Sequence, residues 1–175
     1  MNKDADLHAA LERLERKLSK LSPVEAIKLI DAEIISVVSP HHVPHYEVRK
    51  AAILRDSDNL NDAINLLKQS VSNYKSIDSA RFFAGQYLLE LGNYDEAIEQ
   101  LTECIKLCGL SGEQWYLDSS YLLRAYCAAK TNNAKLANDD LNRIDDDDAM
   151  SCIPVEPVVS KSSINFMLQK NNTMK

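Results

Sequence analysis

The stretch that decides the fold is SARFFAGQYLLELGNYDEAIEQLTECIKL, residues 79–107. Apolar residues recur in it at helical spacing on both sides of a break at Gly92, which predicts two amphipathic helices joined by a short turn. Gly92 is expected to end the first helix, because glycine adopts the left-handed backbone conformation of a helix end at little cost. Gly85 in the first helix and Ala97 in the second are small enough to let the two helices approach closely. The stretch therefore predicts an antiparallel helix hairpin.

The second helix of this hairpin has two counterparts elsewhere in the chain. NLNDAINLLKQSV, GNYDEAIEQLTECI and NNAKLANDDLNRI superpose with an alanine in register, at Ala63, Ala97 and Ala137. A small residue lies twelve positions upstream of each alanine, at Ala51, Gly85 and Ala125. The first interval is 34 residues and the second is 40, and LCGLSGEQW supplies the extra length as a loop or an extended helix end. A recurrence of this period indicates a helical repeat.

This pattern resembles the tetratricopeptide repeat, a helix–turn–helix unit of the same length. In residues 79–107 the family's small, apolar and turn positions are taken by Gly85, Leu88, Gly92, Tyr94, Ala97, Leu101 and Cys104. The resemblance is clear over residues 44–144 and looser over the first 40, where Ala26 in SPVEAIKLIDAEI takes the alanine position. It departs from the family in lacking a tryptophan early in the first helix and a proline after the hairpin that ends near Cys108.

The resemblance implies an all-α fold, a right-handed superhelical array of antiparallel helix hairpins in a single domain over residues 1–175. A divergent N-terminal hairpin is expected over 1–39 and three repeats over 44–144. Residues 145–175 are expected to hold an acidic run, an extended segment and a short capping helix, because the last repeat of such an array needs its apolar face covered. The alternative for this tail is recognition of a partner.

Local signals refine these boundaries. Leu7, Leu11, Leu14 and Leu18 share one helix face. Ser22 before Pro23 predicts the start of a second helix, since proline suits the first helical position. A third helix is expected to start near Pro44. In the tail, Ser160 or Ser162 is expected to cap a helix that turns inward its apolar residues Ile164, Met167 and Leu168.

Composition argues against several classes of function. The net charge of −6 disfavours binding to nucleic acid or to an anionic membrane, since both require clustered lysine and arginine. The N-terminus lacks the apolar core of a signal peptide and no apolar run is long enough to span a membrane, so a cytoplasmic location is expected. The four cysteines, Cys104, Cys108, Cys127 and Cys152, are then expected to be reduced thiols that serve in packing.

Two segments contain residue types that bind metals. His41, His42 and His45 in HHVPH could together bind zinc, but no carboxylate or cysteine lies at a matching short spacing, so exposed histidines are expected. The aspartate run 145–148 lacks the spaced ligands and the glycine of a calcium-binding loop, and a solvated linker is expected. No nucleophile–base constellation or phosphate-binding glycine loop is present, so no enzyme, cofactor or metal is predicted.

The resemblance implies a protein partner held in a concave groove that the first helix of each pair lines. The corresponding residues are His45, Val48, Ala52 and Arg55, then Ser79, Phe82, Gln86 and Leu89, then Ser119, Leu122, Tyr126 and Lys130. The lysine and asparagine clamp of chaperone-binding arrays is replaced here by Val48 and Ala52, which argues against that role. A second candidate surface is acidic and aromatic, and consists of Trp115, Tyr116, Asp145, Asp146, Asp147 and Asp148.

Charge is uneven along the chain, and it guides the functional hypothesis. Residues 90–118 contain seven acidic residues against Lys106 alone, and Asp139 and Asp140 extend this acidic character. We therefore predict a cytoplasmic immunity protein that binds and neutralises a basic, nuclease-like toxin by competing for its phosphate-binding residues. The alternatives are a secretion chaperone or an assembly adaptor that holds a client in the groove, and an ordinary solvated surface in place of the acidic face. The sequence leaves the binding face and the oligomeric state open.

Overall fold

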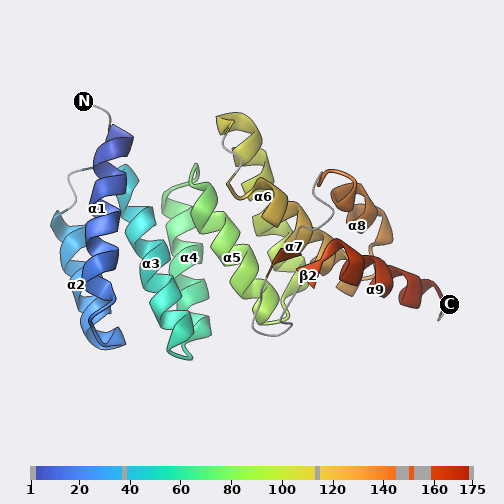
Figure 1. Cartoon of the computed structure of the whole chain (residues 1–175), viewed down its shortest axis with the longest axis horizontal. Coiled ribbons are helices and arrows are strands. Elements are labelled where there is room, and N and C mark those ends of the chain that lie inside the picture. The colour runs from blue at the N-terminus through green and yellow to red at the C-terminus, as the bar shows by residue number, and fades with distance from the viewer. Residues whose placement is uncertain (1–2, 37–38, 113–114, 145–149, 152–158, 174–175) are drawn as a thin grey trace. The chain divides into compact units, whose positions relative to one another are not determined.

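The computed structural model describes residues 3–36, 39–112, 115–144, 150–151 and 159–173, and these are almost entirely helical (Figure 1). The helices are α1 Lys3–Leu18, α2 Pro23–Ser36, the 3₁₀ turn η1 Pro40–His42, α3 Val43–Asp56, α4 Leu60–Asn73, α5 Asp78–Glu90, α6 Tyr94–Ser111, α7 Leu117–Lys130, α8 Ala134–Leu141 and α9 Lys161–Thr173. Two short strands, β1 Met150–Ser151 and β2 Val159–Ser160, pair antiparallel. The predicted all-α helical repeat array is confirmed.

The chain divides into two compact units, Met1–Lys75 and Ser76–Lys175. Unit 1 contains α1 to α4 and unit 2 contains α5 to α9 with the two strands. The expectation of one domain over residues 1–175 stays a prediction.

The core of unit 1 forms where the apolar stripe of α1 meets α2 and α3. It contains Leu11 and Leu14 from α1, Ile30 from α2 and Tyr46 from α3, with Leu7, Leu18, Leu29, Ile34 and Ile53 packed around them. The predicted leucine face of residues 7–18 is therefore buried as expected.

Helix α2 starts at Pro23, as predicted, and a capping box fixes that start. The backbone N–H of Ser22 donates to Glu25 Oε2 at 3.0 Å, and its hydroxyl donates to the same oxygen at 2.6 Å. In return, the backbone N–H of Glu25 approaches Ser22 Oγ at 3.4 Å. The hydrogen bonds from Ser22 lower the pKa of the Glu25 carboxyl.

Three hairpins share one turn geometry, so the repeat is visible in the backbone conformation as well as in the sequence. The connections α3–α4, α5–α6 and α7–α8 each contain one residue of positive φ, at Asp58 (61°), Gly92 (84°) and Asn132 (60°). The N–H of the following asparagine donates to the backbone carbonyl five residues earlier, at 2.9, 2.8 and 2.8 Å. Gly92 was predicted to end its helix, and its counterparts are Asp and Asn, the other residue types that tolerate this conformation.

Helices α5 and α6 approach each other closely at Gly85. Gly85 faces Leu101, and a Cβ at Gly85 would lie 2.6 Å from Leu101 Cγ and 3.4 Å from the Ala97 carbonyl oxygen. Ala97 and Leu101 are fully buried, as are Ala63 and Ala137 at the equivalent alanine positions. The predicted close approach at Gly85 and Ala97 is confirmed.

Helix α6 accounts for part of the longer repeat interval. It runs for 18 residues to Ser111, so the extended helix end expected as one option over residues 107–115 is present. Gly112 ends it in the left-handed conformation at φ 75°, and its N–H donates to the Cys108 carbonyl at 3.0 Å.

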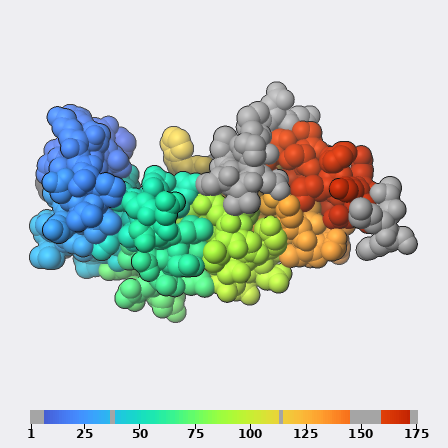
Figure 2. Space-filling model, turned by 90° about the horizontal axis from the view of Figure 1, so that it is seen from below, coloured from blue at the N-terminus to red at the C-terminus, as the bar shows by residue number. Residues whose placement is uncertain are grey.

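The C-terminal helix α9 packs against α7 and α8 (Figure 2). Ser160 caps it, as one predicted option required, because the Ser163 N–H donates to Ser160 Oγ at 3.2 Å. Ile164 and Leu168 are buried and Met167 is half-buried. The Asn171 amide donates to the Ala129 carbonyl at 3.1 Å, which ties α9 to the end of α7.

One acidic residue assigned to a solvated acidic face is instead internal. Asp140 is 1% exposed and binds Arg124 bidentately, with distances of 2.8 Å from Nε to Oδ2 and 2.6 Å from Nη2 to Oδ1. Arg124 Nη1 also donates to Thr102 Oγ1 at 2.9 Å, so this side chain of α7 joins α6 to α8. The expectation that Asp140 faces solvent is wrong, because the sequence does not reveal the arginine that neutralises it.

A Gly85→Ala substitution should destabilise the fold. Alanine normally stabilises a helix interior relative to glycine, but the new methyl group would overlap Leu101, so we expect a loss of about 1–3 kcal/mol. The control is Gly109→Ala in α6, where nothing lies within 4 Å of the added Cβ, and a gain of up to about 1 kcal/mol is expected. Urea unfolding followed by circular dichroism measures both. Equal stabilisation by the two variants would contradict the close contact.

Removing the Asp140 carboxylate should strongly destabilise the fold, since it leaves the Arg124 guanidinium without its buried partner. We expect Asp140→Ala to lower the free energy of unfolding by about 3–5 kcal/mol. The neighbouring exposed Asp139 offers a control of identical chemistry, and Asp139→Ala should stay within about 0.5 kcal/mol of the parent chain. Similar unfolding midpoints for the two variants in urea would argue against a structural role for the pair.

Candidate protein-binding surfaces

The structure buries most apolar residues of the predicted groove. Val48 of α3, Phe82 and Leu89 of α5 and Tyr126 of α7 are all buried, with exposed fractions of 2% for both Leu89 and Tyr126. Helix α5 is buried around most of its circumference, which is typical of an internal helix. These four residues act first as core residues, and their contact with a partner stays a prediction.

The polar residues of the predicted groove are more accessible. His45, Arg55 and Gln86 are half-buried, and Lys130 is exposed. Lys130 Nζ lies 5.1 Å from the centre of the Tyr126 ring, a cation–π distance. Tyr126 also meets Tyr94 of α6 edge to face, with ring centres 6.4 Å apart.

An aromatic cluster joins α5 to the start of α7. The rings of Phe82 and Tyr116 lie 4.8 Å apart at 30°, and Phe83 meets both of them, at 5.3 and 6.1 Å. Trp115, next to Tyr116 in the chain, is 86% exposed. We call Phe82, Phe83, Tyr116 and Trp115 the aromatic surface. It brings together Phe82, predicted for the groove, and Tyr116 and Trp115, predicted for a separate surface.

The connection between α6 and α7 exposes a second large apolar side chain. Leu110, in the last turn of α6, is 78% exposed. Leu110 and Phe83 were absent from the predicted site residues. The additional length of the repeat interval was the signal that could have identified this region, because residues beyond the common repeat are not needed for its packing.

The acidic part of the predicted surface is described only in part. Asp145, Asp146, Asp147 and Asp148 lie outside the described residues. Among the described residues, Asp95, Glu96 and Glu99 of α6 are exposed, and Asp118 in the first turn of α7 is exposed near the aromatic surface.

The cysteines of the described part are free and buried, as expected for packing residues. Burial raises the pKa of the Cys104 and Cys127 thiols to about 12 and also raises the pKa of Cys108. The Cys104 thiol donates to the Asp78 carbonyl at 3.4 Å and accepts from the Ser120 hydroxyl at 3.3 Å. Cys152 lies outside the described residues. Protonated, buried thiols are poor nucleophiles.

The histidine segment is helical, and of its three histidines only His41 is exposed as expected, while His42 and His45 are half-buried. His41 and His42 belong to the turn η1 and His45 to the first turn of α3. Within the described ranges, no three His, Cys, Asp or Glu side chains are grouped so that they could hold a metal ion. In the same ranges, no helix is long and apolar enough to cross a membrane.

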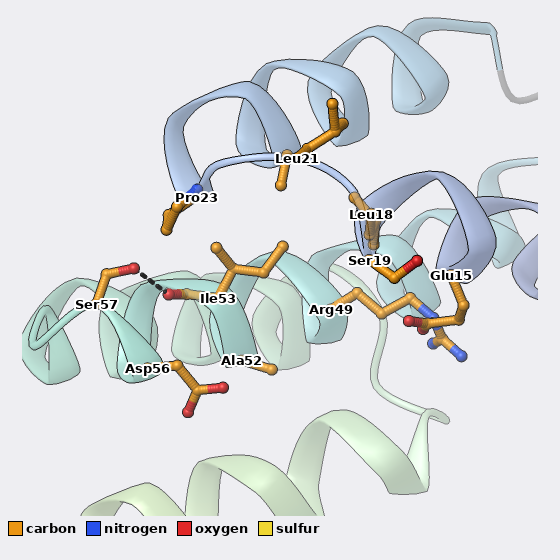
Figure 3. Close-up of a pocket in the computed structure, with 11 residues that line it drawn as sticks. Glu15, Leu18, Ser19, Leu21, Pro23, Arg49, Ala52, Ile53, Asp56 and Ser57 are labelled. Carbon is orange, nitrogen blue, oxygen red and sulfur yellow. Dashed lines mark hydrogen bonds and ion pairs between the residues drawn. The ribbon is translucent and has the colours of Figure 1, made fainter.

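Unit 1 contains a pocket of about 420 Å³ between the α1–α2 turn and α3 (Figure 3). Its lining residues are Glu15, Leu18, Ser19, Leu21, Pro23, Ala26, Arg49, Ala52, Ile53, Asp56 and Ser57. Glu15 and Arg49 lie together at one end, Asp56 and Ser57 lie toward the other end, and Ile53 lies between them. Ala52 was among the predicted groove positions, while the contribution of the α1–α2 turn was not foreseen.

Comparison with known proteins supports the repeat. A family model described as tetratricopeptide repeat matches residues 78–109, which contain α5 and most of α6. No curated protein matches the sequence. The chain is therefore a tetratricopeptide-like protein, and this fold is typical of non-enzymatic scaffolds for protein interaction.

Several solved structures share the fold at low sequence identity. PlcR of Bacillus thuringiensis in its apo form is 15% identical with a TM-score of 0.63, over 74% of this chain and 52% of PlcR. A tetratricopeptide repeat protein from Parabacteroides merdae is 14% identical with a TM-score of 0.62, over 79% and 52% of the two chains. YrrB, described as having an unusual peptide-binding site, is 17% identical with a TM-score of 0.56, over 80% of each chain. The chain thus spans about half the length of the first two.

The raised thiol pKa values predict that the buried cysteines of the folded chain resist ionisation at alkaline pH. In a Cys152→Ser variant, Cys104 and Cys127 of the folded chain should stay protonated at about pH 10, whereas the same thiols of the urea-unfolded chain should ionise near the ordinary value of about 9. Because the unfolded state loses these protons first, the thiols should lower the free energy of unfolding as the pH rises from about 9 to about 12. The rate at which iodoacetamide alkylates each cysteine, followed by mass spectrometry, measures its thiolate. Full ionisation at about pH 10 with the helical signal intact would contradict the burial.

Proposed function

We propose that the chain is a non-enzymatic protein-binding module that docks one protein partner on the aromatic surface of unit 2. The observation that carries this proposal is the exposure of Trp115, which is 86% exposed and directly precedes Tyr116, whose ring contacts that of Phe82. Tryptophan and tyrosine are enriched among the residues that contribute most to binding energy at protein interfaces. An indole that is exposed to water in the free chain is suited to insert into a partner's pocket.

The comparisons support a polypeptide ligand. PlcR has also been solved in complex with the peptide PapR7 and DNA, and YrrB is described as having a peptide-binding site. Both proteins share the fold of this chain at 16–17% identity in these structures. Such likeness supports the class of ligand and leaves its identity to experiment.

Within this class we favour an immunity protein that neutralises a basic, nuclease-like toxin. Exposed carboxylates at Asp95, Glu96 and Glu99 on α6, and at Asp118 beside the aromatic surface, support attraction of a basic partner. A secretion chaperone is the alternative, and it needs accessible apolar groove residues to hold an extended client. The burial of Leu89 and Tyr126 supports the first choice over the second.

Affinity capture from the source organism tests the docking surface. We expect Trp115→Ala to retain the captured partner at least about tenfold less well than the parent chain, as for a residue central to an interface. Ile35→Ala is the matched control, because Ile35 of α2 is an equally exposed large apolar residue, at 87%, in the other unit. Equal capture by all three chains would exclude the aromatic surface.

Coexpression then tests the immunity role. The captured protein should inhibit growth when expressed alone, and the full chain should relieve that inhibition while Trp115→Ala should not. A captured protein that is harmless alone would exclude the immunity role and leave the chaperone or adaptor.

A further inference from the structure

The pocket of unit 1 is a second site with its own chemistry. Its middle is apolar, formed by Leu18, Leu21 and Pro23 on the side of the α1–α2 turn and by Ala52 and Ile53 on α3 (Figure 3). Its volume of about 420 Å³ falls within the range of about 300–1,000 Å³ that is usual for ligand pockets. It is large enough for more than one side chain of a peptide.

The charged groups at one end of the pocket already neutralise each other. Arg49 Nε lies 2.7 Å from Glu15 Oε1, as an ion pair without hydrogen-bond geometry. Arg49 Nη1 donates to the His45 carbonyl at 2.9 Å. With its guanidinium engaged by Glu15 and His45, Arg49 is poorly placed to bind an incoming carboxylate.

The other end carries a carboxylate that faces solvent. Asp56 Oδ1 lies 3.3 Å from Arg55 Nη1, in an exposed ion pair of the kind that contributes little to stability. Ser57 Oγ donates to the Ile53 carbonyl at 2.7 Å, so the hydroxyl closes the helix end beside Asp56. Among the lining residues, the two carboxylates of Glu15 and Asp56 outnumber the one guanidinium of Arg49.

We propose that this pocket, named the turn pocket, binds a peptide segment that presents a bulky aliphatic side chain next to an arginine or lysine. The aliphatic group fills the space among Leu18, Leu21 and Ile53, where its burial removes apolar surface from water. The neighbouring cation reaches the Asp56 carboxylate, which supplies charge complementarity. The site lies in residues 1–75 and the aromatic surface in residues 76–175, so the two proposals stand or fall separately.

Amide chemical shifts of the ¹⁵N-labelled full chain test the turn pocket. The probes are N-acetyl-leucyl-arginine amide, N-acetyl-leucyl-glutamate amide and N-acetyl-seryl-arginine amide. We expect the leucyl-arginine probe to give saturable shifts, in the millimolar range, at residues 18–26 and 49–57. The other two should bind at least about fivefold more weakly, because each lacks one of the two contacts.

Two variants of the lining sharpen the test. Ala52→Phe fills the pocket and should abolish the shifts, and Asp56→Lys should reverse the preference in favour of the leucyl-glutamate probe. Asp56→Lys changes an exposed residue at the end of α3 and should fold normally, so the proposal remains testable if Ala52→Phe does not fold. The control is Asp139→Lys, an equal change of charge in unit 2, which should leave the binding of all three probes unchanged.

Several results would overturn the proposal. These are the absence of saturable shifts, equal binding of the arginine and glutamate probes, or unchanged binding in the folded Ala52→Phe variant. Shifts at residues 18–26 that depend on protein concentration without any probe would indicate that a second copy of the chain occupies the pocket. Trp115→Ala should bind the probes like the parent chain. A negative result for the turn pocket therefore does not bear on the proposal that a partner docks on the aromatic surface.

Discussion

The packing of unit 2 depends on the close approach of two helices at Gly85. Because this residue has no Cβ, the Leu101 side chain occupies the space that a methyl group would need. The side chain of Leu101 on α6 therefore packs directly against the backbone of α5. The α3–α4 and α7–α8 hairpins carry buried Ala51 and Ala125 at the corresponding position. Because each hairpin has a small residue at this position and an alanine twelve residues later, its two helix backbones can approach closely. The larger side chains around them are then free to differ between repeats.

The sequence predicted the features that depend on neighbours along the chain. The leucine face of α1, the helix start at Ser22 and Pro23 and the Ser160 cap are local patterns that need no knowledge of tertiary contacts. The turn at Gly92 was predictable because glycine signals a left-handed residue. The equivalent turns at Asp58 and Asn132 gave no such signal, since both residue types are also common in ordinary loops.

The candidate surfaces were harder to predict, because their residues meet only in the folded chain. The resemblance to the tetratricopeptide repeat placed Phe82 and Tyr126 in a groove but did not say which tertiary neighbours cover them, and both are buried. The contact between the rings of Phe82 and Tyr116 joins residues that are far apart in sequence. The same holds for the carboxylate of Asp140, whose partner Arg124 belongs to the preceding helix. In each case the missing information is the identity of the tertiary neighbour.

The shortest α-helix of the described part has a consequence for cooperativity. Helix α8 has eight residues, fewer than the roughly 12–15 that an isolated helix needs to persist in water. It is held by the Asp140–Arg124 pair on one side and by α9 on the other. The helices α7, α8 and α9 are therefore expected to unfold together as one cooperative unit, which is larger than one repeat. Amide exchange in α8 should accordingly report the opening of α9, and the C-terminal helix sets the lifetime of the final hairpin.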